Sequence, residues 1–96
     1  MRAKKTAQGI EVRKIPFPFP ADFCAHWHPD DPALSQIINS TSLFLPYMEP
    51  FIIDTICQAS EHITDPELQN EAKAWIGLES QHFMQHRRFN EVLIAR

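Results

Sequence analysis

The sequence predicts an all-α protein: a helical hairpin that forms half of a four-helix bundle and carries an extended N-terminal arm. Apolar residues recur at helical spacing in two long stretches of the chain. Two helix starts are marked by Asp31-Pro32 and Asp65-Pro66, because Asp is a good N-cap and Pro is favoured at the first helical position. No segment shows the alternation of polar and apolar residues that is typical of a strand.

Residues 1–20 are expected to form the arm, and residues 21–96 the helical domain. The polar residues 1–14 are expected to be mobile. Residues 15–20 (IPFPFP) are expected to be extended, because each Pro fixes its own φ and disfavours helix in the residue before it. The helical pattern meets no stop signal before the last residue, so we expect either part of a longer domain or a chain that is completed by another subunit.

Prolines divide the predicted helices. The first helix should run over 32–44 and be broken or kinked at Pro46. A second helical segment should cover 46–62, with an irregular entry caused by Pro50. The last helix should cover 66–93, and the short turn before it makes the two long segments antiparallel neighbours.

Composition excludes several classes of function. The net charge is −3, with nine basic and twelve acidic residues, so no basic surface for nucleic acid is expected. The basic N-terminus lacks the apolar core of a signal peptide, and no apolar run is long enough to span a membrane, so we expect a cytoplasmic protein. Cys24 and Cys57 are expected to be reduced thiols that serve in packing.

A group of metal-ligating residues lies on the predicted apolar faces. Glu79, His82 and His86 fall within about 60° of one another on a helix. Glu49 lies in the apolar stripe of the preceding helix. A carboxylate that faces a core must be paired, protonated or bound to metal. One Glu plus one Glu-x-x-His step is half of the ligand set with which helical bundles hold two metal ions. The alternative is that these Glu and His residues only form buried hydrogen bonds.

A second cluster precedes the first helix. His26 and His28 are two positions apart in an extended segment, so both could reach one metal with help from Asp30. The alternative, which we prefer, is that Trp27 anchors this segment and that the polar residues cap the helix.

Four separated motifs carry a family resemblance: HWHPDDP, FLPYMEPFI, ITDPEL and WIGLESQHFMQHRRFNEVL. With these motifs the chain resembles the predicted metal-dependent hydrolases, a bacterial all-helical family, from about Phe17 to Leu93. Family members usually continue further, so the resemblance is to their N-terminal portion. It implies metal binding and hydrolysis, and the ligand pattern resembles that of ferritin-like bundles. The metal ligands that it implies are Glu49, Glu79, His82 and His86, with His26 and His28 as weaker candidates.

These observations lead to the expectation of a metal-dependent hydrolase with one or two divalent metal ions. Iron is favoured, and zinc and manganese are the alternatives. The substrate is an unknown small molecule. A ferritin-like di-iron protein that activates oxygen and a non-catalytic helical dimerisation module are the alternative functions. A homodimer is expected, because pairing two hairpins would cover the apolar stripes and complete a dinuclear ligand set.

Overall fold

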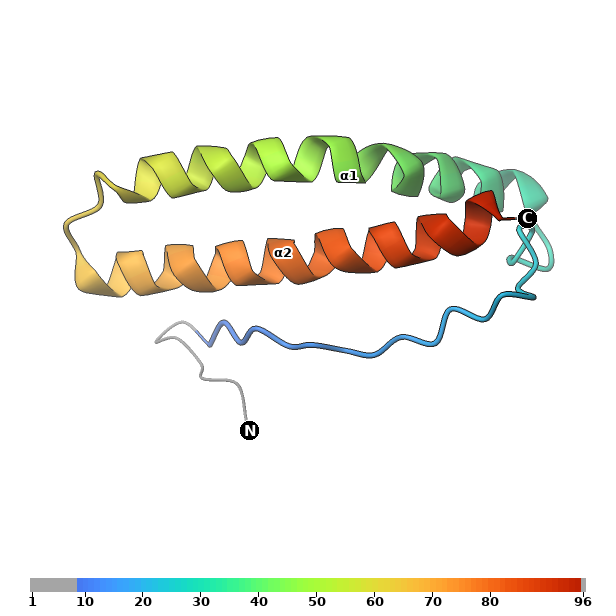
Figure 1. Cartoon of the computed structure of the whole chain (residues 1–96), viewed down its shortest axis with the longest axis horizontal. Helices are drawn as coiled ribbons and strands as arrows, with labels where there is room; N and C mark the ends of the chain where they lie inside the picture. Colours follow the sequence, from blue (N-terminus) through green and yellow to red (C-terminus); the bar gives the residue numbers. More distant parts are fainter. Residues whose placement is uncertain (1–8, 96) are drawn as a thin grey trace.

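The structure is a computed structural model in which residues 9–95 are described. It contains helix α1 (Pro32–Ser60) and helix α2 (Pro66–Ile94), which lie side by side as an antiparallel hairpin (Figure 1). A short turn over residues 61–65 joins them. The predicted all-α hairpin is therefore confirmed.

Both helices begin at the predicted Asp-Pro pairs. The Asp31 carboxylate accepts a hydrogen bond of 3.0 Å from the backbone N–H of Leu34. The Asp65 carboxylate accepts one of 3.1 Å from the N–H of Glu67. Each cap satisfies a backbone donor that the first turn of a helix leaves without a partner.

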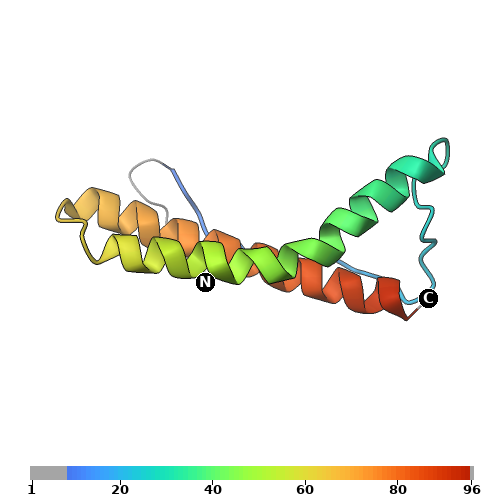
Figure 2. The same ribbon diagram turned by 90° about the horizontal axis from the view of Figure 1, so that it is seen from above.

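The break predicted at Pro46 as one alternative is not observed, because α1 continues through both Pro46 and Pro50. The other alternative, a kink, is observed, since the helix bends near its middle, as the view from above shows (Figure 2). Pro46 has no N–H, so it cannot donate to the carbonyl of Ser42 one turn earlier. That carbonyl accepts a hydrogen bond of 2.8 Å from Nδ2 of Asn90 on α2. Packing between the helices thus replaces the lost donor, and α1 is not interrupted.

The contact between the helices is more polar than the sequence predicts. Among the described residues no hydrophobic side chain is fully buried, and the buried side chains are all polar. Those on α1 recur at helical spacing, which places them on one face of the helix. Ser42 and Glu49 contact α2, whereas Ser35 and Asn39 form hydrogen bonds with residues 25–28. We call this set the polar seam: it consists of Ser35, Asn39, Ser42 and Glu49 on α1 and Asn90 on α2. The buried positions of this part of the hairpin are therefore polar, although the sequence places Glu49 within an apolar stripe.

The arm runs along α2, as Figure 1 shows, and is held by side chains of that helix. Gln85 donates from Nε2 to the carbonyl of Ile15 at 2.9 Å. Arg88 donates from its guanidinium to the carbonyl of Phe17 at 3.0 Å. The mobility predicted for residues 1–14 concerns in part residues 1–8, which lie outside the described residues.

Aromatic packing adds to this attachment. The ring of Phe89 on α2 lies 5.7 Å from that of Phe19 and 5.4 Å from that of Phe23. Further along, Gly77 allows a close approach, because a Cβ there would lie 2.7 Å from a methyl carbon of Val12. Phe19 of the arm and Phe23 just after it therefore pack on α2.

Two further predictions concern the cysteines and the membrane. Cys24 and Cys57 are free thiols, but both are exposed, so the prediction that they serve in packing is wrong. Within residues 9–95, neither helix combines the length and the apolar character that crossing a bilayer requires.

Candidate metal centre

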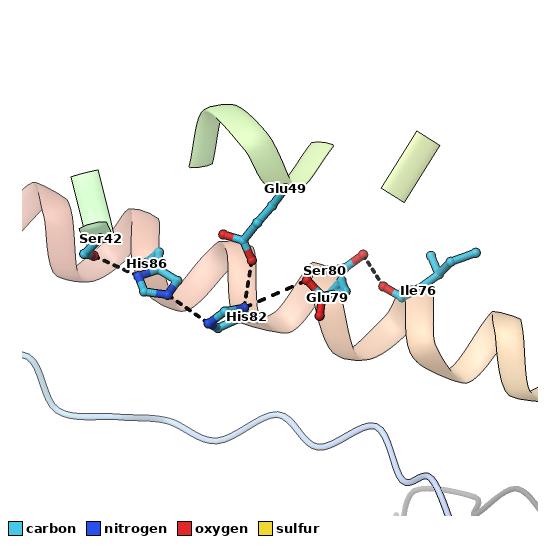
Figure 3. A network of polar contacts seen from close by, with 7 residues as sticks. All are labelled: Ser42, Glu49, Ile76, Glu79, Ser80, His82 and His86. Carbon is cyan, nitrogen blue, oxygen red and sulfur yellow. Dashed lines mark hydrogen bonds and ion pairs between the residues drawn. The ribbon is translucent and has the colours of Figure 1, made fainter. Parts of the chain in front are cut away.

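The candidate site lies halfway along the hairpin, where one carboxylate of α1 meets two histidines of α2 (Figure 3). Glu49 stands on the inner line of the polar seam and is only 2% exposed. His82 and His86 are one turn apart on α2, so their rings lie next to each other. Helical periodicity places His82 and His86 on one face of α2, and the packing of α1 against α2 brings Glu49 to them.

Glu49 meets His82 across the hairpin, inside the contact between the helices. Its Oε2 lies 2.8 Å from Nδ1 of His82, yet neither carboxylate oxygen has a hydrogen-bond partner. Burial raises the pKa of Glu49, the nearby Glu79 raises it further, and His82 opposes both effects. A buried carboxylate with free lone pairs is costly unless a cation or a proton compensates it.

The two imidazoles face each other through their Nε2 atoms. These atoms are 2.8 Å apart, and the ring centroids are 4.4 Å apart at an interplanar angle of 67°. Nδ1 of His86 lies 2.8 Å from Oγ of Ser42. Burial lowers the pKa of His86, and so does the neighbouring His82. Both effects favour the neutral imidazole, which is the form that binds a metal.

These three residues fit a metal ion. Glu49, His82 and His86 each offer one ligand atom, and the three atoms lie within 4.8 Å of one another. A carboxylate with two imidazoles is a donor set that suits iron, zinc and manganese. The carboxylate oxygens that lack a hydrogen-bond partner are available for coordination.

Glu79 lies next to this cluster but is not one of its three members. Its Oε2 is 4.0 Å from Nδ1 of His82, and its side chain is 24% exposed. The convergence of Glu49, Glu79 and His82 that the helical stripes predict is therefore observed. A ligand role for Glu79 stays a prediction.

The histidines before α1 lie elsewhere. His26 is exposed, and neither His26 nor His28 belongs to the cluster around Glu49. The backbone N–H of His28 donates to Oγ of Ser35 at 2.9 Å, and Nδ1 of His28 accepts from the N–H of Asp30 at 3.3 Å. The neighbouring Trp27 donates to Asn39 at 2.9 Å, which anchors this segment on α1 as the alternative interpretation expects. A metal at His26 and His28 stays a prediction.

Sequence reasoning missed Ser42 and Asn90. Oγ of Ser42 donates to Oδ1 of Asn90 at 2.6 Å while it also contacts His86. One signal was present in the sequence: Pro46 leaves the Ser42 carbonyl without its helical donor, so a side-chain amide was needed from elsewhere. Nothing in the sequence showed that Asn90 would supply it.

Two shallow grooves flank the arm where it passes the histidines. One has a volume of about 260 Å³, reaches His86 and is otherwise mainly apolar, with Phe17, Phe19 and Phe89 in its wall. The other has a volume of about 310 Å³ and reaches His82. The side chain of His82 is 51% exposed, so solvent reaches the cluster from this side.

The fold and the site define an all-α protein with a buried carboxylate and two histidines in an arrangement suited to a divalent metal. The chain belongs to the family of predicted metal-dependent hydrolases, whose model matches residues 11–96. Neither a curated protein nor a solved structure gives a significant match.

Proposed function

We propose that this protein is a hydrolase that acts with a divalent metal bound by Glu49, His82 and His86. The observation that carries the proposal is the buried carboxylate of Glu49, which lies beside two imidazoles and has no hydrogen-bond partner. Membership of the metal-dependent hydrolase family supports the same reaction class.

A divalent metal at such a site polarises a substrate oxygen and lowers the pKa of a bound water. The protein supplies the remaining functions. Glu49 provides a negative charge inside the hairpin, and the helix backbones hold His82 and His86 in place. Glu79 is partly exposed beside His82, so it can accept a proton at the open side of the site.

The metal that we propose is iron, with zinc and manganese as alternatives, because mixed carboxylate and imidazole ligands suit all three. One ion needs only the cluster of this chain. Two ions need further ligands, of which Glu79 is the nearest candidate.

The grooves beside the arm indicate the type of substrate. The groove at His86 has aromatic walls, so it favours an apolar group next to the bond that is cleaved. The groove at His82 includes Arg13, which can pair with a negative charge on the same substrate.

We also propose that the functional unit is a homodimer. No hydrophobic side chain is fully buried among the described residues, while several large ones on the outer face of α1 are exposed. Tyr47 is 84% exposed and Phe51 is 72% exposed. Exposed apolar side chains in such number are typical of an interface. A second hairpin would also bring a second Glu and a second Glu-x-x-His step to the bundle.

The first experiment is elemental analysis of protein purified without chelators, followed by hydrolysis assays with a panel of activated esters and phosphoesters. We expect close to stoichiometric metal and a hydrolytic activity that is lost with a chelator and restored by the metal. Glu61→Ala serves as the control, because Glu61 is exposed at the end of α1. Metal-free protein would contradict the proposal, and oxygen uptake without hydrolysis would favour the di-iron alternative.

A further inference from the structure

Ser42 behaves differently from the hydroxyl residues next to it. Ser40 and Thr41 donate to carbonyls of their own helix, at Gln36 and Ile37, with distances of 2.8 and 3.0 Å. Such local bonds are the usual choice of Ser and Thr within a helix. The hydroxyl of Ser42 instead bonds to two residues of α2 and is 2% exposed. The Ser42 hydroxyl therefore acts on α2 and not on its own helix.

The orientation of Asn90 is fixed by the bend in α1. The carbonyl of Ser42 can only accept a hydrogen bond, and Pro46 cannot supply the helical donor. Nδ2 of Asn90 donates to that carbonyl at 2.8 Å. The amide group is consequently oriented with Oδ1, which can only accept, 2.6 Å from Oγ of Ser42.

This orientation decides where the single proton of Ser42 goes. Because Oδ1 of Asn90 is an acceptor, the Ser42 hydroxyl donates to it. Oγ of Ser42 has then no proton left for Nδ1 of His86, although the two atoms are 2.8 Å apart. The contact is a hydrogen bond only if Nδ1 of His86 carries a proton and donates it.

We propose that Ser42 and Asn90 are positioning residues that hold His86 as its Nδ1–H tautomer, so that Nε2 of His86 is the metal-binding atom. The inference rests on the proposed function for the identity of the ligand, and on hydrogen bonds alone for the tautomer. In a neutral imidazole only one nitrogen carries a proton, and the other presents a lone pair. Nε2 of His86 therefore points its lone pair toward Nε2 of His82, 2.8 Å away.

Hydrogen-bond partners of this kind commonly orient metal-binding histidines. A group that accepts from one ring nitrogen fixes the ring and leaves the other nitrogen free for the metal, and its loss typically costs about 10- to 100-fold in metal affinity. Here the accepting group is a hydroxyl whose own proton is committed to Asn90. His86 thus donates to Oγ of Ser42, the Ser42 hydroxyl donates to Oδ1 of Asn90, and Nδ2 of Asn90 donates to the backbone carbonyl of Ser42.

The test uses the full chain labelled with ¹⁵N at its histidines, first without metal and at about pH 8, where an ordinary histidine is neutral. Long-range proton–nitrogen spectra identify which ring nitrogen is protonated. Zn²⁺ is then added, and its affinity is measured by competition with a chromophoric chelator. We expect a protonated Nδ1 on His86 in the metal-free chain and a zinc-induced shift at Nε2.

Four variants separate positioning from general structural damage. Asn90→Ala frees the Ser42 proton for Nδ1 of His86, so we expect the Nε2–H tautomer to appear and zinc affinity to fall about tenfold. Ser42→Ala should mix the tautomers and weaken zinc binding by a similar factor. Ser42→Thr keeps the hydroxyl and should restore both properties. Ser40→Ala is the matched control on the same helix and should change neither.

The outcomes discriminate clearly. A wild-type His86 that is protonated at Nε2, or an Asn90→Ala chain with unchanged tautomer and affinity, would overturn the inference. If Asn90→Ala does not fold, the tautomer and the zinc affinity of Ser42→Ala are compared with those of Ser42→Thr, and equal values in these two variants would overturn the inference. A wild-type chain with the Nδ1–H tautomer but without zinc binding would confirm the hydrogen-bond assignment, overturn Nε2 as the metal-binding atom and reject the proposed function.

Discussion

Oε2 of Glu49 lies 2.8 Å from Nδ1 of His82, which joins the middle of α1 to the middle of α2. The two partners differ in environment, since the side chain of Glu49 is 2% exposed and that of His82 is 51% exposed. The carboxylate of Glu49 is therefore the group of this pair that needs a compensating cation or proton. A metal ion at this position would compensate the charge of a carboxylate that water does not reach.

A graded series of carboxylate variants tests the assignment of ligands. Glu49→Ala removes a buried cluster member, so metal content should fall close to zero. Glu79→Ala removes a carboxylate 4.0 Å from His82, so metal content should fall partly. Glu61→Ala changes an exposed residue and should leave the metal content unchanged. Elemental analysis of the three proteins checks the order, and equal metal content in all three would refute the assignment.

The pH dependence of stability should report on Glu49 in metal-free protein. Burial raises the folded pKa of Glu49 above its ordinary value of 4.5, so the folded state prefers the protonated form. The stability that this preference contributes is present below that ordinary value and is lost as the pH rises through the folded pKa. The free energy of unfolding of Glu49→Gln, relative to that of wild type, should therefore be higher at about pH 8 than at about pH 4. Urea unfolding of chelator-treated proteins measures the difference, and an equal difference at both pH values would contradict this account.

Replacing Pro46 should separate helix stability from metal binding. Pro46→Ala restores an N–H that can donate to the Ser42 carbonyl, so the free energy of unfolding should rise, by up to about 3 kcal/mol. The same bond competes with Asn90 for that carbonyl, so zinc affinity should fall. Thermal unfolding and the chelator competition assay measure the two effects. A loss of stability together with unchanged zinc binding would show that the bend does not orient Asn90.

The association state can be tested on the purified chain. We expect a dimer at micromolar concentration in light scattering, with a larger dimer fraction after iron is added. Phe51→Ser removes an aromatic ring that is 72% exposed, so it should shift the equilibrium to monomer without loss of helical circular dichroism. A wild-type monomer that is indifferent to iron would reject the dimer.

Sequence reasoning located the hairpin and much of the candidate site because both follow from local rules. The Asp-Pro caps fix where α1 and α2 begin, and helical spacing puts His82 and His86 on one face. The break considered at Pro46 does not occur, since propensity rules take no account of a donor from another helix. The roles of Ser42 and Asn90 depend on a contact between residues far apart in the chain. Neither residue belongs to an apolar pattern, so periodicity does not reveal them.

The polar seam also determines how the two helices are aligned along their length. Apolar surfaces tolerate sliding, because one aliphatic contact replaces another at little cost. Directional contacts do not. A shift of α2 by one turn would separate Ser42 from Asn90 and Glu49 from His82 together, and would leave several buried polar groups without partners. The seam therefore selects a single alignment of the hairpin and keeps the carboxylate opposite the histidines, at the expense of the stability that an apolar contact would have given.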